Sequence, residues 1–339
     1  MIRIGVLGCG DVANFGHIPA ILSTDGVELV ALYDPDPARL SSTSARFDGL
    51  PTFDSTEEFY GQGLDAVVIA SPAPTHLAGV LEAATRDVHV LCEKPISEDE
   101  SEAETMIGAM NISGKIFMVG FCYRFSPVAR QIKQWIEEGT VGKIRALRLI
   151  YIWNLHGRYQ QQPDHSWVEN PRWAGRMVEG GPMVDCGVHM IDLSRWWLES
   201  EIVRAAASGA WVADYEAPDH MWLNMDHRCG AHTNVEMSFT YCHTAREPIN
   251  HFSYHLIGDG GVLRYDRDGY VLEARTGQET IRVPGASEKN FEGMYAAFRD
   301  AIRSGDTTGL PLAQDGLIAT KIAREATNLV MGDRARPTA

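Results

Sequence analysis

The sequence predicts an α/β protein of two domains, a parallel sheet followed by an α+β domain. Up to residue 121, short apolar runs rich in β-branched residues alternate with helical stretches, which is the rhythm of a parallel sheet covered on both faces. After about residue 121 the strands become longer and alternate in polarity, as antiparallel strands do. The length of 339 residues agrees with two domains of roughly 150 residues each. We therefore place the domains at residues 1–121 and 122–339.

The first domain contains five continuous apolar runs that predict buried strands. Between them lie amphipathic stretches that predict the crossover helices of βαβ units. The predicted strands are 2–7, 27–33, 66–70, 88–92 and 116–120, and two of the predicted helices are 76–85 and 99–110.

The second domain is expected to carry a large, open, mostly antiparallel sheet. Residues 203–283 hold strand signals, and between 232 and 241 apolar and polar residues alternate, which indicates a strand buried on one face. Asp268-Gly269 marks a hairpin turn. The other predicted elements are a strand at 143–153 and helices at 125–138, 182–198, 290–304 and 312–331, with a long polar stretch at 156–179.

Composition narrows the class of protein. The chain has 30 basic and 45 acidic residues, a formal net charge of −15, which disfavours nucleic acid or an anionic membrane as the main partner. The 6 cysteines are scattered without a CxxC pair, as expected of buried thiols in a reducing cytoplasm. We expect no signal peptide and no membrane span, because no apolar run approaches about 18 residues.

A glycine motif follows the first predicted strand. Gly8-Cys9-Gly10-Asp11-Val12-Ala13 matches GxGxxA, the fingerprint of a dinucleotide-binding Rossmann domain. The first glycine allows a tight turn, the second lets the backbone approach a pyrophosphate, and a small third residue lets helix and strand pack closely. The N–H groups at the start of the helix, around Asp11 and Val12, would then face the phosphates.

Asp34 ends the second predicted strand and is expected to bind the adenosine ribose hydroxyls. A carboxylate there repels a 2′-phosphate, so NAD is favoured over NADP. The alternative is a turn acid before a proline. After the third strand, Ser71, Pro72, Thr75 and His76 are expected to line the crevice near the nicotinamide ribose, with Thr75 capping the next helix. A turn without a ligand role is the alternative there.

Lys94 stands at the end of the fourth predicted strand, in Glu93-Lys94-Pro95. The carboxyl ends of strands in an open α/β sheet face the ligand crevice, and Pro95 biases Lys94 away from helix. An amine on such a backbone points into a cleft. The alternative is a surface lysine that starts a loop.

Asp185, His189 and Asp192 fall on one face of the predicted 182–198 helix. A carboxylate four residues from a histidine can orient the imidazole, which titrates near neutral pH as a general base must. One alternative is a buried histidine satisfied by its neighbour. A metal site is disfavoured, because the cysteines are wrongly placed and no HExxH occurs.

Several residues are candidates for a substrate pocket. Aromatic rings can cover the face of a sugar, although each ring could equally belong to the core or to an interface. Arginines could bind hydroxyls or a carboxylate. The candidates are Trp153, His156, Tyr159, Trp167, Trp173, Arg124 and Arg172.

Together these motifs resemble the Gfo/Idh/MocA oxidoreductase family over nearly the whole chain. The resemblance is carried by the glycine motif, Asp34, Glu93-Lys94-Pro95, Tyr123 to Pro127, and Gly181 to Asp192. It implies that Lys94, Asp185 and His189 are catalytic, that Glu93 and Lys94 contact the cofactor, and that the Lys94–Pro95 bond is cis. It also implies that the final helices pack on the first domain, and that the chain is a dimer or tetramer joined through the open sheet.

Three departures from the family pattern bear on pocket shape and cofactor contacts. Ala73 stands where asparagine is often found, Cys122 stands where asparagine is frequent before the arginine, and Glu179 and Pro182 interrupt the usual glycine-rich run. None of them alters Lys94, Asp185 or His189.

The expected activity is NAD-dependent oxidation of a secondary alcohol on a sugar, sugar derivative or cyclitol. His189 would act as acid and base, Lys94 would polarise the reacting oxygen, and Asp185 would orient the substrate or its catalytic neighbours. The resemblance also admits a glycosidase that uses NAD transiently, and a non-catalytic NAD-binding sensor. The three intact residues argue against the sensor.

Overall fold

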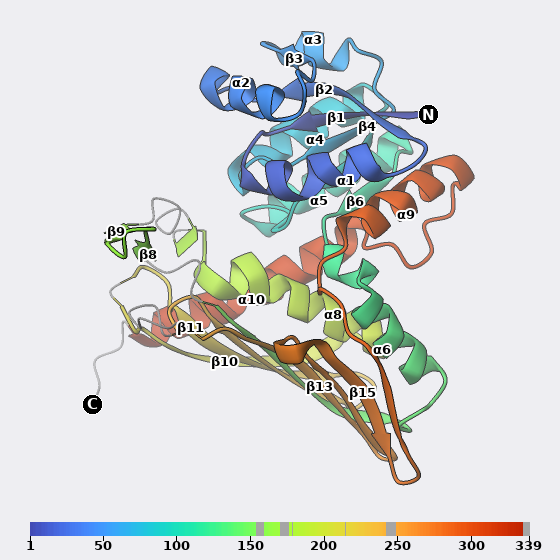
Figure 1. Cartoon of the computed structure of the whole chain (residues 1–339), viewed down its shortest axis with the longest axis vertical. Coiled ribbons are helices and arrows are strands. Elements are labelled where there is room, and N and C mark those ends of the chain that lie inside the picture. Colours follow the sequence, from blue (N-terminus) through green and yellow to red (C-terminus); the bar gives the residue numbers. More distant parts are fainter. Residues whose placement is uncertain (154–158, 170–175, 178, 214, 242–248, 335–339) are drawn as a thin grey trace. The chain divides into compact units, whose positions relative to one another are not determined.

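The structure, a computed structural model, describes the chain apart from residues 154–158, 170–175, 178, 214, 242–248 and 335–339 (Figure 1). It divides into two compact units. The first comprises Met1–Phe125 and Lys289–Ile318, and the second comprises Ser126–Glu288 and Ala319–Ala339. The first unit thus holds a segment near the carboxyl terminus in addition to the expected residues 1–121.

A six-stranded parallel sheet forms the centre of the first unit. Its strand order is β3-β2-β1-β4-β5-β6, so the direction of winding reverses between β1 and β4. Loops at such a switch point diverge and leave a crevice at the carboxyl ends of the strands. The strands are β1 (Ile2–Leu7), β2 (Val27–Tyr33), β3 (Thr52–Phe53), β4 (Ala66–Ile69), β5 (His89–Cys92) and β6 (Phe117–Val119).

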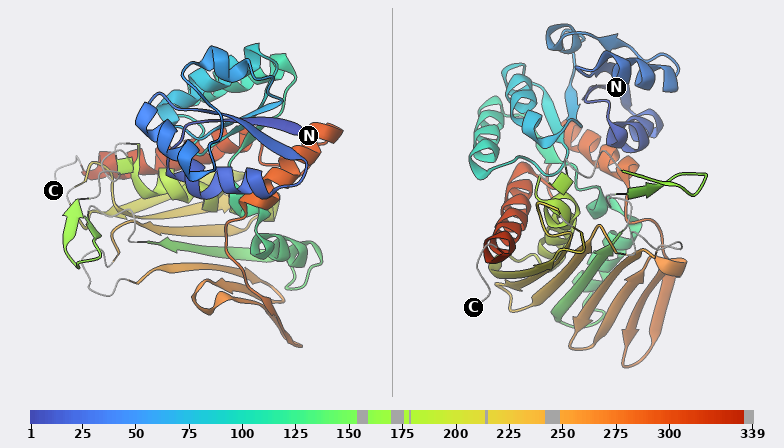
Figure 2. Two further views of the ribbon diagram at one scale, coloured as in Figure 1. Left: turned by 45° about the horizontal axis from the view of Figure 1, so that its top comes forward. Right: turned by 90° about the vertical axis from the view of Figure 1, so that its left-hand side faces the viewer.

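Helices cover both faces of this sheet (Figure 2). Helix α4 packs against α5, and α1 packs against α9, which comes from the carboxyl-terminal segment. The helical elements of this unit are η1 (Ala13–His17), α1 (Ile18–Ser23), α2 (Pro37–Arg46), α3 (Thr56–Tyr60), η2 (Ala73–Thr75), α4 (His76–Thr85), α5 (Glu100–Ser113), η3 (Cys122–Phe125) and α9 (Phe291–Ser304); α10 (Ala313–Arg334) begins here and continues into the second unit.

The second unit is built on an eight-stranded sheet of order β10-β11-β12-β7-β13-β14-β15-β16. Only the β12–β7 pair is parallel, so the sheet is mostly antiparallel, as predicted. The strands are β7 (Ile144–Ile152), β10 (Ile202–Ala210), β11 (His220–His227), β12 (His232–Ser238), β13 (His251–Gly258), β14 (Gly261–Asp266), β15 (Val271–Thr276) and β16 (Thr280–Pro284).

One face of this sheet packs against helix α8 (Val188–Leu198), which in turn packs against α6 (Pro127–Glu137). Trp197 of α8 fills that interface: its ring meets Tyr254 edge-on at 5.1 Å, and its indole N–H donates to the carbonyl of Ala129 at 3.0 Å. Along most of the strands, alternation sends polar side chains to the other face. The strand register aligns one such row across the sheet, comprising Asn224, Asn234, Arg148, His255, Arg264, Glu273 and Arg282.

The structure adds detail to the predicted 182–198 helix and shortens the predicted strand at 232–241. The predicted helix is present, and it consists of a π-helical turn, η4 (Met183–Gly187), followed directly by α8. The alternation does not reach residue 241, because β12 ends at Ser238 and both Phe239 and Thr240 are buried. The polar stretch 156–179 contains a small antiparallel pair, β8 (Tyr159–Gln161) and β9 (Trp167–Glu169).

Four cysteines are buried as expected, namely Cys9, Cys92, Cys122 and Cys186, whereas Cys229 is half-buried and Cys242 lies outside the described residues. Across the part of the chain that the structure describes, no helix is both long and apolar enough to cross a membrane.

Candidate active site

The glycine turn between β1 and η1 has a backbone that only glycine can adopt at its first position. Gly8 has a φ of +99°, and a Cβ there would lie 2.6 Å from the backbone nitrogen of Ser71. Gly10 differs, because a Cβ built on it would meet no atom within 4 Å. The space beside Gly10 is therefore open, while Gly8 is pressed against the neighbouring strand end.

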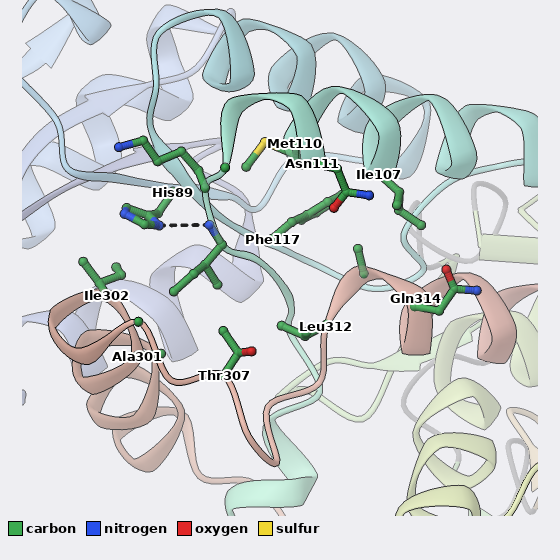
Figure 3. Close-up of a pocket in the computed structure, with 15 residues that line it drawn as sticks. His89, Ile107, Met110, Asn111, Phe117, Ala301, Ile302, Thr307, Leu312 and Gln314 are labelled. Carbon is green, nitrogen blue, oxygen red and sulfur yellow. Dashed lines mark hydrogen bonds between the residues drawn. The ribbon is translucent and has the colours of Figure 1, made fainter.

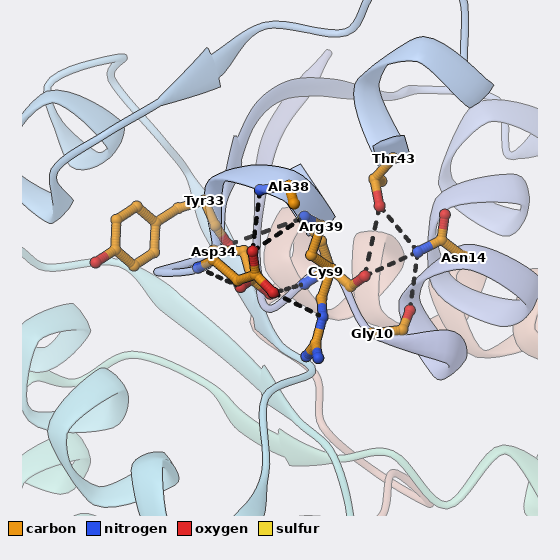
Figure 4. A network of polar contacts seen from close by, with 9 residues as sticks. Cys9, Gly10, Asn14, Tyr33, Asp34, Ala38, Arg39 and Thr43 are labelled. Carbon is orange, nitrogen blue, oxygen red and sulfur yellow. Dashed lines mark hydrogen bonds and ion pairs between the residues drawn. The ribbon is translucent and has the colours of Figure 1, made fainter. Parts of the chain in front are cut away.

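Asp34 holds the glycine turn in shape (Figure 4). Its carboxylate accepts the backbone N–H of Cys9 at 2.8 Å and that of Asp36 at 2.9 Å. Burial, and then the negative charge of Asp34, raise the pKa of the Cys9 thiol to about 12, so this cysteine stays protonated. The carboxylate stands at the end of β2, where a ribose would be recognised.

Asn14 completes this network and was not predicted from the sequence. Its Nδ2 lies 2.9 Å from both the Cys9 and Gly10 carbonyls and 3.0 Å from the hydroxyl of Thr43 (Figure 4). A side-chain amide can bridge several carbonyls of one turn in this way. The turn is thus fixed from the β2 side by Asp34 and from the helix side by Asn14.

These features fit a dinucleotide. A helical run begins at Asp11, directly after the open space beside Gly10, and the start of a helix next to open space is where a pyrophosphate is bound in Rossmann domains. Ala13 is fully buried, which is the close helix–strand approach expected of the third motif position. The residues present therefore suit the pyrophosphate and adenosine ribose of NAD.

The loop after β4 is tied to the loop after β5 through His76. The two ring nitrogens of His76 lie 2.9 Å from the Ser71 carbonyl and 3.1 Å from the Ile96 carbonyl, and the ring is buried. Burial lowers the pKa of His76 despite these two carbonyls. Both ring nitrogens face the backbone, so His76 braces the crevice wall.

Thr75 takes the N-cap position of α4, but its side chain does not cap the helix. Its hydroxyl lies 2.7 Å from the Ser71 hydroxyl and 2.8 Å from the Pro72 carbonyl instead. The expected cap is therefore wrong. The hydroxyl pair of Ser71 and Thr75 is nevertheless presented at the carboxyl end of β4.

Glu93 and Lys94 follow β5 directly, and the Lys94–Pro95 bond is cis. Glu93 is 6% exposed; one carboxylate oxygen lies 2.9 Å from Nε2 of His17, and the other accepts the backbone N–H of Lys94 at 3.2 Å. Burial alone would raise the pKa of Glu93, but the hydrogen bond and charge of His17, with the charge of Lys94, hold it below its usual value. The carboxylate is thus ionised beside a half-buried Lys94.

Asp185 and His189 belong to the second unit, where η4 runs directly into α8. Both are buried, at 8% and 5% exposure. The guanidinium of Arg176, which the sequence did not single out, donates to the Asp185 carboxylate. Burial alone would lower the pKa of Arg176, but the charge of Asp185, followed by the charges of Cys186 and Glu179, raises it above its usual value. Arg176 and Asp185 therefore form a largely buried ion pair.

The other predicted pocket residues lie in varied surroundings. Arg124 is buried and forms an ion pair with Asp315 at 3.1 Å within the first unit. Trp153 stacks on Tyr151 at 5.5 Å, while Tyr159 and Trp167 are exposed on β8 and β9. The remaining three, Trp173, His156 and Arg172, lie outside the described residues.

A cavity of about 510 Å³ lies at the other end of the parallel sheet (Figure 3). It is lined by His89 and Phe117, the first residues of β5 and β6, and by residues of α5 and α9. Ligands of open α/β sheets bind at the carboxyl ends of the strands, so this cavity is separate from the candidate site. Within the described residues, no group of three or more His, Cys, Asp or Glu side chains could hold a metal ion.

Comparison with known proteins agrees with this geometry. A family model described as an oxidoreductase family with an NAD-binding Rossmann fold matches residues 2–121, and the GFO/IDH/MocA C-terminal domain model matches residues 129–264. The chain is 26% identical to an inositol 2-dehydrogenase of Acidothermus cellulolyticus over 344 residues, covering 98% of this chain and 94% of the relative. It is 28% identical to a scyllo-inositol 2-dehydrogenase (NAD(+)) of Bacillus subtilis, covering 73% and 71%.

A solved structure shares the fold across both domains. An oxidoreductase from Agrobacterium radiobacter, in complex with NAD+, L-tartaric acid and magnesium, superposes with a TM-score of 0.80 at 22% identity. The match covers 98% of this chain and 97% of the other.

Proposed function

Because the chain belongs to the Gfo/Idh/MocA oxidoreductase family, whose first domain binds NAD, we propose that it transfers a hydride between NAD and a secondary alcohol or ketone of a sugar, sugar derivative or cyclitol. The observation that carries the proposal is the position of Lys94. It follows β5 at the carboxyl edge of the sheet, the edge that also holds the glycine turn and Asp34. The two inositol dehydrogenases among the relatives support a polyhydroxylated substrate.

In this proposal three side chains act on the substrate. His189 takes the proton of the hydroxyl group, since imidazole titrates near neutral pH. Lys94 donates a hydrogen bond to the oxygen as negative charge develops there. Asp185 orients the substrate or its catalytic neighbours and is itself held by Arg176. Bound NAD supplies the hydride acceptor.

The cofactor contacts fall to the glycine turn and to the ends of β2 and β4. We assign NAD rather than NADP, because the carboxylate of Asp34 would repel a 2′-phosphate. Ser71, Pro72 and Thr75 would meet the nicotinamide ribose. The polar atoms of His76, Glu93 and Arg124 bind other parts of the protein. We therefore propose that these residues hold the site residues in position without contacting the ligand.

The test is a panel of sugars, inositols and sugar acids with NAD and NADP, read by the absorbance of the reduced nicotinamide. His189→Ala and Lys94→Ala should each lower kcat by roughly 100-fold or more while NAD still binds. Full activity in both variants would refute the roles assigned to these residues. Glycoside hydrolysis without net NADH would replace the dehydrogenase with a redox-assisted glycosidase.

We also propose that the chain forms a dimer or tetramer through the open face of its eight-stranded sheet. This face carries exposed side chains on neighbouring strands, among them Ile257 at 49% exposure and Arg148. Ile257→Asp places a charge on the proposed interface and should lower the mass measured by sedimentation velocity. An unchanged oligomeric mass in the Ile257→Asp variant would contradict the proposal.

A further inference from the structure

His17 joins two side chains that are far apart in the sequence. Its Nε2 lies 2.9 Å from a carboxylate oxygen of Glu93, and its Nδ1 lies 2.7 Å from the hydroxyl of Tyr295. All three residues belong to the first unit, and the His17 and Tyr295 side chains have no solvent exposure. A buried polar chain of this kind is costly unless each member is satisfied, and here each of the three side chains has a partner.

The protonation of the chain follows from its chemistry. Glu93 is ionised and can only accept, so Nε2 of His17 carries the hydrogen between them. Burial, and then the charge of Glu93, raise the pKa of Tyr295 well above its usual value. The phenol therefore keeps its proton. When the imidazole is neutral, the phenol O–H donates a hydrogen bond to Nδ1. Both bonds of His17 have a defined direction in that state.

The far end of the chain reaches the backbone of Lys94. The second carboxylate oxygen of Glu93 accepts the Lys94 N–H at 3.2 Å. The amide of Glu93 itself donates to the Ile69 carbonyl at 2.9 Å, which continues the pairing of β4 with β5. The backbone hydrogen bonds between β4 and β5 thus end at the Glu93 amide. The next amide, that of Lys94, is bonded by the Glu93 carboxylate instead.

The surrounding atoms leave these side chains little freedom. A Cβ on Gly120 would come within 2.6 Å of the Glu93 carboxylate, and a Cβ on Gly16 would come within 2.7 Å of the Phe291 ring. That ring meets His17 edge-on at 5.2 Å. Gly120 and Gly16 therefore let the Glu93 carboxylate and the Phe291 ring pack directly against the backbone.

This chain is distinct from the network that shapes the glycine turn. Asp34 and Asn14 hold the turn, whereas His17, Glu93 and Tyr295 act on the end of β5. The two networks share no residue, although Asn14 and His17 lie on the same η1 turn. Separate substitutions can therefore alter the affinity for the cofactor and the position of Lys94.

We propose that His17 is a positioning residue that holds the Glu93 carboxylate against the Lys94 N–H and thereby sets the place of the reactive amine. The catalytic consequence rests on the proposed function, while the effect on the Lys94 backbone does not. Tyr295 contacts the imidazole from its other side, which links helix α9 to the lysine.

Two substitutions at one position separate the two bonds of His17. In His17→Gln the side-chain amide nitrogen falls where Nε2 was, so the donor to Glu93 is kept. In His17→Asn the amide nitrogen falls where Nδ1 was, so that donor is lost. His227→Gln is the control, since His227 is also buried with both nitrogens engaged, by the Ser200 carbonyl and the Thr233 hydroxyl, but lies in the second unit.

The first measurement is hydrogen exchange of single backbone amides, which requires no substrate. We expect the Lys94 amide to exchange about tenfold or more faster in His17→Asn than in His17→Gln, with the Glu93 amide unchanged as an internal reference. Equal exchange of the Lys94 amide in both variants would overturn the inference, whether or not the protein proves to be a dehydrogenase.

The second measurement is turnover against cofactor affinity. His17→Asn should lower kcat by about tenfold or more and change the Kd for NAD by less than about threefold, while His17→Gln and His227→Gln stay near the parent. A parent-like kcat in His17→Asn, with Lys94→Ala inactive, would overturn the positioning role alone. If Lys94→Ala were as active as the parent, the proposed function would fail instead, and hydrogen exchange would still decide the structural part.

Discussion

Gly8 and Ser71 lie in backbone contact, so the glycine turn after β1 rests directly on the end of β4. A Cβ on Gly8 would reach within 2.6 Å of the Ser71 nitrogen, and the φ of +99° is one that side chains rarely adopt. Gly10, two residues later, faces open space. The two glycines of the motif therefore differ: Gly8 is required by the fold, and Gly10 is the one that we propose to leave room for the ligand.

Alanine substitutions should distinguish the role of Gly8 in folding from the role of Gly10 in binding NAD. Gly8→Ala should lower the free energy of unfolding by roughly 2–5 kcal/mol, from the unfavourable φ together with the clash. Gly10→Ala should leave the melting temperature nearly unchanged but weaken NAD, because its methyl group enters the space assigned to the pyrophosphate. Calorimetry and NAD titration check both. NAD affinity that is unaffected by Gly10→Ala would place the cofactor elsewhere.

Asp34 is expected to serve both the fold and the choice of cofactor. In Asp34→Ala the backbone amides of Cys9 and Asp36 lose their acceptor, which costs about 1–3 kcal/mol for each amide that stays buried. NAD binding should weaken, and the preference for NAD over NADP should relax as the repelling charge is removed. The observable is the ratio of the two dissociation constants.

The control for Asp34 is its neighbour Asp36, which caps α2 by accepting the amides of Ala38 and Arg39. Asp36→Ala should cost about 1 kcal/mol of stability without moving the NAD to NADP ratio. A ratio that shifts equally in both variants would show that the loop, and not the Asp34 carboxylate, sets the preference.

Much of the first unit could be predicted from sequence. β1, β2 and α4 begin and end at the predicted residues, because continuous β-branched runs and amphipathic stretches are strong local signals. The glycine turn was likewise expected from a short motif, whereas the cis Lys94–Pro95 bond was expected from the resemblance to the family. Local patterns suffice where one segment carries the whole signal.

The polar partners of the site could not be predicted in this way. The hydrogen-bond partners of His17 lie 76 and 278 positions further along the chain, so no local sequence pattern predicts these contacts. Arg176 meets Asp185 only because of the path of the intervening chain. The π-helical turns η1 and η4 also escaped prediction, since an α-helix and a π-turn present much the same apolar pattern.

Arg176 and Asp185 should behave as a coupled pair. Their side chains are 19% and 10% exposed, so removing the guanidinium leaves a largely buried carboxylate without its cation. Arg176→Met should therefore lower the free energy of unfolding by about 3 kcal/mol, and adding Asp185→Asn should recover most of that loss. A double-mutant cycle by urea unfolding measures the coupling. The double variant should stay deficient in kcat, because Asp185 itself is assigned to the site; parent-like turnover would remove Asp185 from it.

His76 predicts how stability depends on pH. Burial lowers the pKa of its imidazole in the folded protein, whereas in the unfolded chain the pKa is about 6.5. As pH falls through that value, the unfolded chain binds a proton that the folded protein does not. The free energy of unfolding should thus be highest above pH 7 and fall toward pH 5, by up to about 1.4 kcal/mol per pH unit for this one group.

The same direction holds for His89 and His227, whose pKa values are also lowered chiefly by burial, so the parent slope should exceed the contribution of His76 alone. Urea unfolding at intervals from pH 8 to pH 5 measures it, above the range where Glu93 begins to contribute in the same sense. His76→Asn removes one titrating group and should flatten the curve between pH 7 and pH 5. If the His76→Asn curve kept the full parent slope, the imidazole of His76 would have to be charged in the folded protein, and its two backbone carbonyls, not its burial, would set its protonation.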